Sequence, residues 1–166
     1  MIIKIVILLI VLLVFLVYKI YFSSYFKVRD VYMSLKSFLD VRDALVLKLV
    51  PEIKNEKMSK VIVNLIDERK ENFKTSYNNS ILADVRLNSE LREFYKSVNE
   101  IKKNDVINSV FSKIINLEKD LKNIRIEYNK AVEKYNDNLI KHKFVCLKVI
   151  RMKPLDTYKV RESWYS

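Results

Sequence analysis

The first residues of the chain form a nearly continuous apolar run. No residue between Ile5 and Tyr18 is charged, and Lys4 and Lys19 stand at the two ends of the run. A helix of about 20 apolar residues is long enough to cross a hydrocarbon core of about 30 Å. No small-x-small cleavage site follows the run, which argues against a signal peptide that is removed. We therefore predict a single transmembrane anchor over residues 1–22.

After the anchor, apolar positions recur every three or four residues, which is typical of an amphipathic helix. The stripe consists of Val28, Val31, Leu35, Phe38, Leu45 and Leu49, and Arg42 interrupts it. Pro51 is expected to kink or end this helix, because proline lacks a backbone donor and clashes with the preceding turn. The pattern predicts one long helix that runs from the membrane to Pro51.

Two shorter helices are predicted next. Lys54–Lys57 is expected to form a loop, and Ser59 is the expected amino-terminal cap of the second helix. The polar run Ser76–Ser80 is typical of a turn. The third helix carries Leu87, Leu91, Phe94, Val98 and Ile101, and its start falls between Ile81 and Ser89.

The fourth helix has the longest regular pattern. Asn104 is the expected cap, and Asp105 places a negative charge where the helix dipole favours it. Apolar residues then alternate in steps of four and three: Val110, Ile114, Leu117, Leu121, Ile124, Tyr128, Ala131 and Tyr135. A repeat of about 3.5 residues indicates left-handed, coiled-coil-like packing of a helix that ends near Lys143.

These segments predict an all-α fold with an antiparallel, up-down four-helix bundle over residues 23–143 after the transmembrane helix. Glycine is absent, and a many-stranded sheet without glycine for its turns would be unusual. In an up-down bundle the fourth helix returns toward the bilayer. The remaining residues, 144–166, form a basic amphipathic tail.

The tail mixes basic and large apolar residues. Between Lys141 and Arg161 there are seven Lys or Arg residues and one acidic residue, Asp156. Such a segment suits an anionic lipid surface, and the membrane is therefore an expected partner through both anchor and tail. The alternative, in which the apolar residues of the tail cover the end of the bundle, stays open.

The sequence YNKAVEKYN in the fourth helix repeats two phenols and two carboxamides at seven-residue spacing. Tyr128, Val132 and Tyr135 share one helix face, and Asn129 and Asn136 lie beside them. Buried hydroxyl and amide groups need hydrogen-bond partners. We predict that both tyrosines are buried, that their hydroxyls bond to neighbouring helices, and that the asparagines lie at the edge of the seam.

A longer pattern includes this repeat: Glu118, Leu121, Arg125, Tyr128, Asn129, Val132, Tyr135 and Asn136. It resembles the carboxyl-terminal motif of the LemA family of bacterial membrane proteins, and Asp40-Val41 with Pro51 resembles that family's first-helix motif. The chain differs from the family at His142-Lys143 and Arg151-Met152. The resemblance implies a membrane-anchored four-helix bundle in the bacterial plasma membrane, with no established catalytic activity. Arg125 is a candidate to pair with an acid on a neighbouring helix, and Asp40 is the expected partner because both residues belong to the matching motifs; a solvated arginine is the alternative.

The residues offer little for catalysis. His142 is the one histidine and Cys146 the one cysteine, so one chain cannot build a two-histidine metal site or a histidine-paired nucleophile. A phosphate-binding glycine loop is also excluded. We expect no enzyme activity, cofactor or metal. The net charge of +11 makes nucleic acid a candidate partner. The lysines are spread along every helix and no known nucleic-acid-binding motif is present, so we expect no binding of nucleic acid.

The basic residues also predict orientation. Lys19, Lys27, Arg29 and Lys36 follow the apolar run, whereas Lys4 alone precedes it, so the positive-inside rule predicts a cytoplasmic body. The main hypothesis is a non-catalytic, single-pass scaffold that interacts with a protein partner or with itself. A structural stalk and a surface-exposed adhesin or antigen are the alternatives.

Overall fold

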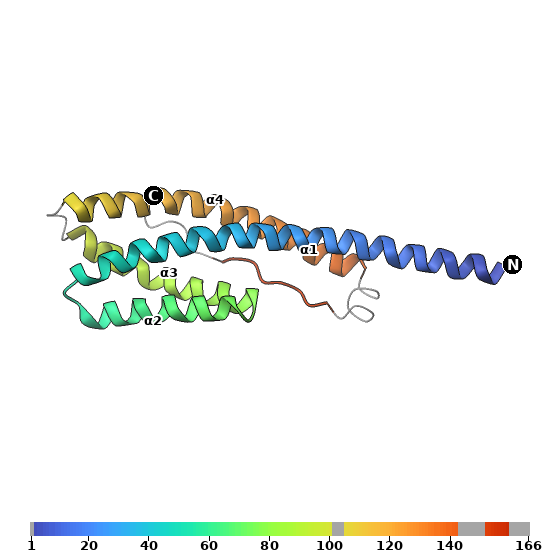
Figure 1. The fold of residues 1–166 in the computed structure, drawn as a ribbon, viewed down its shortest axis with the longest axis horizontal. Helices are drawn as coiled ribbons and strands as arrows, with labels where there is room; N and C mark the ends of the chain where they lie inside the picture. The colour runs from blue at the N-terminus through green and yellow to red at the C-terminus, as the bar shows by residue number, and fades with distance from the viewer. Residues whose placement is uncertain (1, 101–104, 143–151, 160–166) are drawn as a thin grey trace. The chain divides into compact units, whose positions relative to one another are not determined.

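A computed structural model describes residues 2–100, 105–142 and 152–159. Within them the chain is helical and has no strand, which confirms the all-α prediction. The elements are α1 (Ile2–Leu49), the short 3-10 helix η1 (Val50–Glu52), α2 (Glu56–Phe73), α3 (Tyr77–Glu100) and α4 (Asp105–Lys141) (Figure 1). Asn104, Cys146 and most of the tail predicted at 144–166 lie outside the described residues.

α1 is the one helix among the described residues that is long and apolar enough to cross a membrane. Every side chain from Ile2 to Leu16 is exposed, and Val17 is the first buried one, at 7% exposure. The helix then continues to Leu49 without a break. It ends where Pro51 predicts, because η1 carries the proline in its first turn.

Two predicted boundaries are wrong. Asn55, and not Ser59, caps α2: its side chain accepts a hydrogen bond from the backbone N–H of Met58 at 3.1 Å. The loop is shorter than expected, so Ser59 already lies inside the helix. Residues 77–80 belong to the first turn of α3 and not to a turn, because the N–H of Ser80 bonds the carbonyl of Ser76 at 3.1 Å.

The chain divides into two compact units, each treated separately below. The anchor unit comprises residues 1–33 and 127–157, and the body unit comprises residues 34–126 and 158–166. In the anchor unit α1 packs against α4 through aromatic pairs: ring centroids lie 5.1 Å apart for Tyr21 and Tyr135 and 6.1 Å apart for Tyr32 and Tyr128. The amide of Asn138 donates to the hydroxyl of Ser24 at 2.6 Å.

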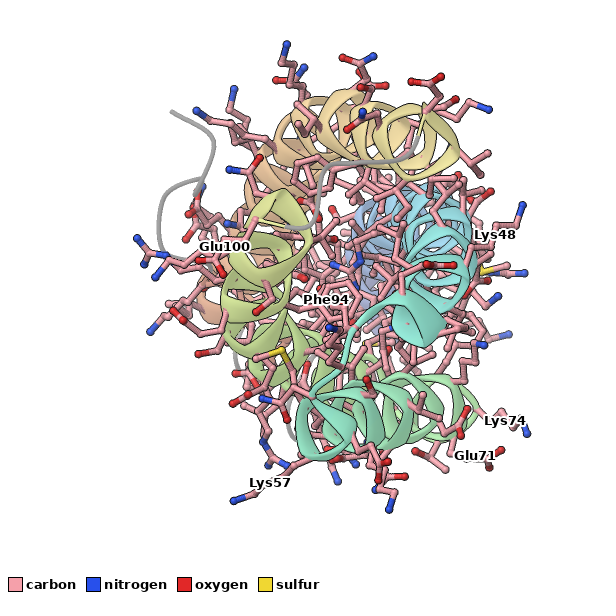
Figure 2. The ribbon with its side chains drawn as sticks, turned by 90° about the vertical axis from the view of Figure 1, so that its left-hand side faces the viewer. Lys48, Lys57, Glu71, Lys74, Phe94 and Glu100 are labelled. Atoms are coloured by element: carbon pink, nitrogen blue, oxygen red, sulfur yellow. The ribbon has the colours of Figure 1, made fainter. Side chains whose placement is uncertain are left out.

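The body unit is built around an apolar core to which all its helices contribute. Its buried members are Val46, Leu49, Ile53, Ile62, Ile66, Leu87, Leu91, Phe94, Tyr95, Val98, Ile107, Phe111 and Ile114. Figure 2 shows Phe94 directed into this core, while Lys57, Glu71 and Lys74 extend outward. Burying apolar side chains of this size is the main stabilising contribution to the unit.

The heptad phase predicted for α4 is half correct. Ile114, Leu121, Tyr128, Ala131 and Tyr135 are buried, but Val110, Leu117 and Ile124 are only half-buried. The buried residues that follow one another in steps of four and three are Ile107, Phe111, Ile114, Glu118, Leu121, Arg125, Tyr128, Val132, Tyr135 and Leu139. These steps therefore pass through two charged residues. In α1 the stripe likewise continues through Arg42, whose side chain is fully buried.

Candidate functional site

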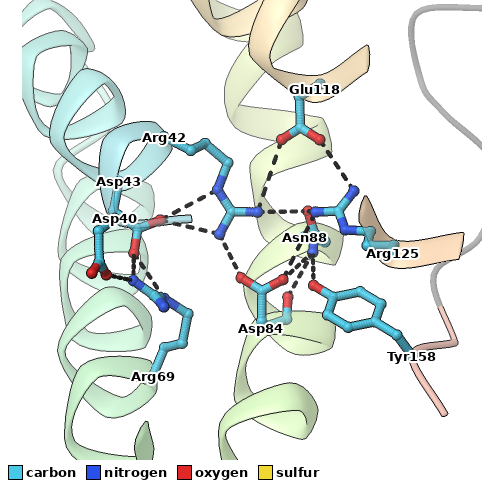
Figure 3. Close-up of polar contacts among 9 residues, drawn as sticks. All are labelled: Asp40, Arg42, Asp43, Arg69, Asp84, Asn88, Glu118, Arg125 and Tyr158. Carbon is cyan, nitrogen blue, oxygen red and sulfur yellow. Dashed lines mark hydrogen bonds and ion pairs between the residues drawn. The ribbon is translucent and has the colours of Figure 1, made fainter. Parts of the chain in front are cut away.

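The charged residues of the seams meet inside the body unit (Figure 3). Arg42 of α1 lies at the centre, with none of its surface exposed. Its Nη2 lies 2.5 Å from Oδ1 of Asp84 in α3 and 3.1 Å from Oδ1 of Asp43. Its Nη1 donates to Oδ1 of Asn88 at 3.0 Å and lies 3.8 Å from Oε1 of Glu118 in α4.

A second arginine extends this ion network toward α2. Arg69 is 1% exposed, and its Nη2 lies 2.7 Å from Asp43 and 2.6 Å from Asp40. Its Nε also donates to Asp43 at 2.9 Å. Asp40 is about one-third exposed and pairs with Lys36 as well, so it forms the rim of the network. Asp43 thus bridges two arginines from two helices.

A third arginine closes the network on the side of α4. Nη1 of Arg125 lies 3.2 Å from Oε2 of Glu118, and Nη2 donates to Asn88 at 3.3 Å and lies 3.8 Å from Asp84. The guanidinium carbon is 5.1 Å from the ring centroid of Tyr158, a cation–π contact. Tyr158 is 3% exposed, and its hydroxyl accepts from the amide of Asn88 at 3.1 Å.

The network is electrically balanced. Three buried arginines (Arg42, Arg69, Arg125) face three buried carboxylates (Asp43, Asp84, Glu118), and Asp40 and Lys36 offset each other at the rim. Burying a charge costs free energy of hydration, and opposite charges and hydrogen bonds must compensate for that cost. Pairing of every buried charge with opposite charges lets this unit hold six of them in its core.

The pKa values follow from these contacts. Burial alone would lower the pKa of Arg42, but the carboxylates of Asp84, Asp43 and Glu118 outweigh it and raise that pKa well above its usual value. The pKa of Arg69 is raised in the same way, against its burial, chiefly by Asp43 and Asp40. Burial would raise the pKa of Asp40, yet hydrogen bonds from Lys36 and Arg69 lower it overall. Each of these three shifts favours the charged form of its group.

The expected pair of Arg125 and Asp40 is wrong. Arg125 pairs with Glu118 and Asp84, whereas Asp40 pairs with Arg69 and Lys36. Both residues belong to the same network, at its opposite ends. Sequence reasoning missed its middle members: Arg42, Asp43, Arg69, Asp84 and Asn88. The available signal was that Arg42, Glu118 and Arg125 occupy core positions of their own stripes.

The Tyr-Asn repeat of α4 binds a segment that follows α4 in the chain. Residues 152–159, here called the strap, have no regular secondary structure. The hydroxyl of Tyr135 donates to the carbonyl of Lys153 at 3.0 Å and accepts from the hydroxyl of Tyr21. Asn136 bonds Leu155 twice: its amide donates to the carbonyl at 2.8 Å and its oxygen accepts from the N–H at 3.0 Å.

Tyr128 makes the next contact along the strap. Its hydroxyl donates to the carbonyl of Asp156 at 3.5 Å. Seven helical residues span about 10.5 Å and three extended residues about 10 Å, so the spacing of the two tyrosines matches the carbonyls of Lys153 and Asp156. Both tyrosines are buried, as predicted. The hydroxyl of Tyr135 bonds the neighbouring helix α1 through Tyr21, as expected, and both hydroxyls also bond the strap backbone, which was not expected. The described part of the tail therefore packs on the helices.

The other residues of the two motifs have simpler environments. Leu121 and Val132 are fully buried, and Asn129 and Asn136 are half-buried at the edge of the seam. Val41 is half-exposed, and Pro51 is exposed at the end of α1. In the described part of the chain no group of three or more His, Cys, Asp or Glu residues is placed to hold a metal ion. The described contacts are of two kinds: ion pairs among the buried arginines and carboxylates, and hydrogen bonds from the Tyr-Asn repeat to the backbone of the strap.

Comparison with known proteins adds no identification. The sequence matches no protein-family model and no curated protein.

Proposed function

We propose that this chain is a single-pass membrane protein whose helical body is a non-catalytic scaffold for a protein partner or a second copy. The observation that carries the proposal is the exposed apolar surface from Ile2 to Leu16, on a helix that continues unbroken to Leu49. An exposed apolar surface of this extent would be a liability in water, whereas a bilayer covers it.

The buried chemistry supports a scaffold. Each buried arginine lies within 4 Å of one or more carboxylates, and the strap covers the Tyr-Asn repeat. Buried charges paired in this way favour one arrangement of helices, because a shifted helix would leave a buried charge unpaired. A rigid surface that presents the same residues at all times is what a scaffold needs.

In this proposal the helices form an up-down bundle of the LemA type, in the plasma membrane of a bacterium, with the body in the cytoplasm. The residues that resemble the LemA motifs support the family, and the excess of basic residues after the anchor supports the orientation. The short connections between α1, α2 and α3 favour antiparallel neighbours. Because α1 is 48 residues long, a structural stalk is the second candidate function.

Site-specific photo-crosslinking in membranes tests the scaffold. A photoreactive amino acid is placed at exposed positions of the body unit, for example at Arg92 in α3 and Lys119 in α4. We expect discrete protein adducts at a subset of positions, and their loss when Arg42→Met disrupts the body. The same chain must resist extraction from membranes with alkaline carbonate. Release by carbonate, or no adduct at any surface position, would refute the proposal.

A further inference from the structure

In the anchor unit the end of α4 lies where the exposed apolar part of α1 stops. Tyr128 pairs with Tyr32 and Tyr135 pairs with Tyr21, so later residues of α4 meet earlier residues of α1. Leu139 is 3% exposed, and α4 ends at Lys141, two residues later. Val17 is the first buried residue of α1. The last turn of α4 is therefore close to the segment expected in the bilayer.

Exposed basic residues gather at this level from three elements. Lys19 belongs to α1 and Lys141 to α4, and the strap adds Lys153, whose carbonyl is held by Tyr135. Asp137 is the nearest acidic residue along α4. From Asn138 to Leu155 the sequence has five Lys or Arg residues and no Asp or Glu. Near Tyr32 and Tyr128, by contrast, the sequence includes the acidic residues Asp30 and Glu127.

We propose that Lys19, Lys141 and Lys153 form a docking surface for the anionic headgroups of the bilayer that holds α1. This inference rests on the proposed function, because the anchor brings the surface to the lipid. Lysine stems can lie along apolar surface while their ammonium groups reach the phosphates. Each lysine near an anionic leaflet strengthens binding about fivefold. The strap has a role here, because Tyr135, which contacts Tyr21 of α1, also holds the backbone of Lys153 at this level.

The test uses the full chain in detergent micelles and a fluorescent phosphatidylglycerol, with binding followed by anisotropy. The variant Lys141→Gln/Lys153→Gln removes two charges of the surface. Lys57→Gln/Lys60→Gln removes two exposed charges near the start of α2 and is the matched control. Lys141→Arg/Lys153→Arg keeps both charges. Circular dichroism establishes that each variant has the helix content of the parent.

We expect the parent to prefer phosphatidylglycerol to phosphatidylcholine, and Lys141→Gln/Lys153→Gln to weaken this binding about tenfold or more. The arginine variant and the α2 control should bind like the parent, and added salt should weaken binding in all of them. Equal losses in the two glutamine variants, or equal binding of the neutral lipid, would overturn the proposal.

Inorganic phosphate distinguishes the bilayer from a free anion. At matched ionic strength it should compete no better than chloride; stronger competition would indicate a phosphate site and overturn the lipid proposal. The lipid-binding experiment and the scaffold experiment can fail separately. A chain that resists carbonate and forms adducts but shows no preference for anionic lipid refutes this inference alone.

Discussion

Arg42 places a full positive charge in the core of the body unit. The carboxylates of Asp43, Asp84 and Glu118 compensate for its burial, so the stability of the folded unit depends on these pairs. Buried ion pairs contribute little net stability compared with apolar side chains, but removing one partner strands the others. The cost of losing Arg42 is therefore set by the carboxylates left without it.

We predict that Arg42→Met lowers the free energy of unfolding by about 3–5 kcal/mol. The methionine fills most of the volume, so the loss reports the stranded carboxylates. Urea titration of the full chain in detergent micelles, followed by circular dichroism, measures it. The control is Arg86→Met, which breaks the exposed pair with Glu68 and should cost less than about 1 kcal/mol. Equal effects of the two variants would contradict the network.

Tyr95 predicts a response to alkaline pH. It is 1% exposed, and burial, followed by the charge of Glu118, raises its pKa well above the ordinary 10.0. Its folded pKa exceeds its unfolded pKa, so its contribution is complete below pH 10.0 and is lost as the pH rises above that value. Tyr95→Phe should therefore unfold at a higher pH than the parent. Tyr77→Phe, at a half-buried position, should not, and alkaline titration followed by circular dichroism compares them.

The two tyrosines of the repeat should differ in what their hydroxyls contribute. Tyr135 donates to Lys153 at 3.0 Å and accepts from Tyr21, whereas Tyr128 makes a long bond to Asp156 at 3.5 Å. Tyr135→Phe should lower the unfolding free energy by about 1–1.5 kcal/mol and Tyr128→Phe by about 0.5 kcal/mol or less. Alanine at either position should cost about 3–5 kcal/mol, by the same urea titration. A reversed order for phenylalanine would contradict the described contacts.

At the scale of elements, the strap is held by side-chain contacts, and Asn136 makes two of its hydrogen bonds. Asn136 provides both a donor and an acceptor to Leu155, so it replaces the partners that a neighbouring strand would give. Residues 152–159 have no helical bonds of their own, and Pro154 cannot donate. Side chains of α4, together with Asn88 of α3 at Tyr158, therefore hold this segment.

We predict that Asn136→Ala releases the strap at Leu155 while the helices stay folded. The Leu155 N–H loses its acceptor and should exchange with solvent at the rate of an unstructured peptide. Hydrogen exchange followed by mass spectrometry, on a peptide that covers the strap, measures the change. Asn123→Ala, at an exposed position of α4, is the control and should leave protection unchanged. Protection that persists in Asn136→Ala would show that another contact holds the strap.

Sequence patterns could predict the helices but only half of their contacts. The end of α1 at Pro51 and the buried Tyr128 and Tyr135 follow from local rules of backbone chemistry and periodicity. The apolar pattern does not include Glu118 and Arg125, because charged residues are usually solvated. Their burial depends on partners in other helices, which periodicity cannot identify. The strap has no periodic pattern, so its contacts with the repeat had no signal.

At the scale of the whole molecule, the proposed function depends on α1. Its exposed apolar part supports a membrane location, and residues 34–49 contribute Asp40, Arg42 and Asp43 to the ion network. One continuous helix therefore carries both the proposed anchor and the centre of the folded body. The central claim is that this helix crosses a bilayer and holds the body on one side.

Cysteine accessibility tests this claim directly. Single cysteines replace Ile2 and Lys57 in a Cys146→Ser background, and a maleimide that cannot cross membranes is added to intact spheroplasts of a bacterial host. The account predicts that position 2 reacts at once, whereas position 57 reacts only after the membrane is opened. If position 57 reacts at once and position 2 reacts only after the membrane is opened, the body lies outside and the helix still spans the membrane. Reaction of both positions on the same side would contradict the account.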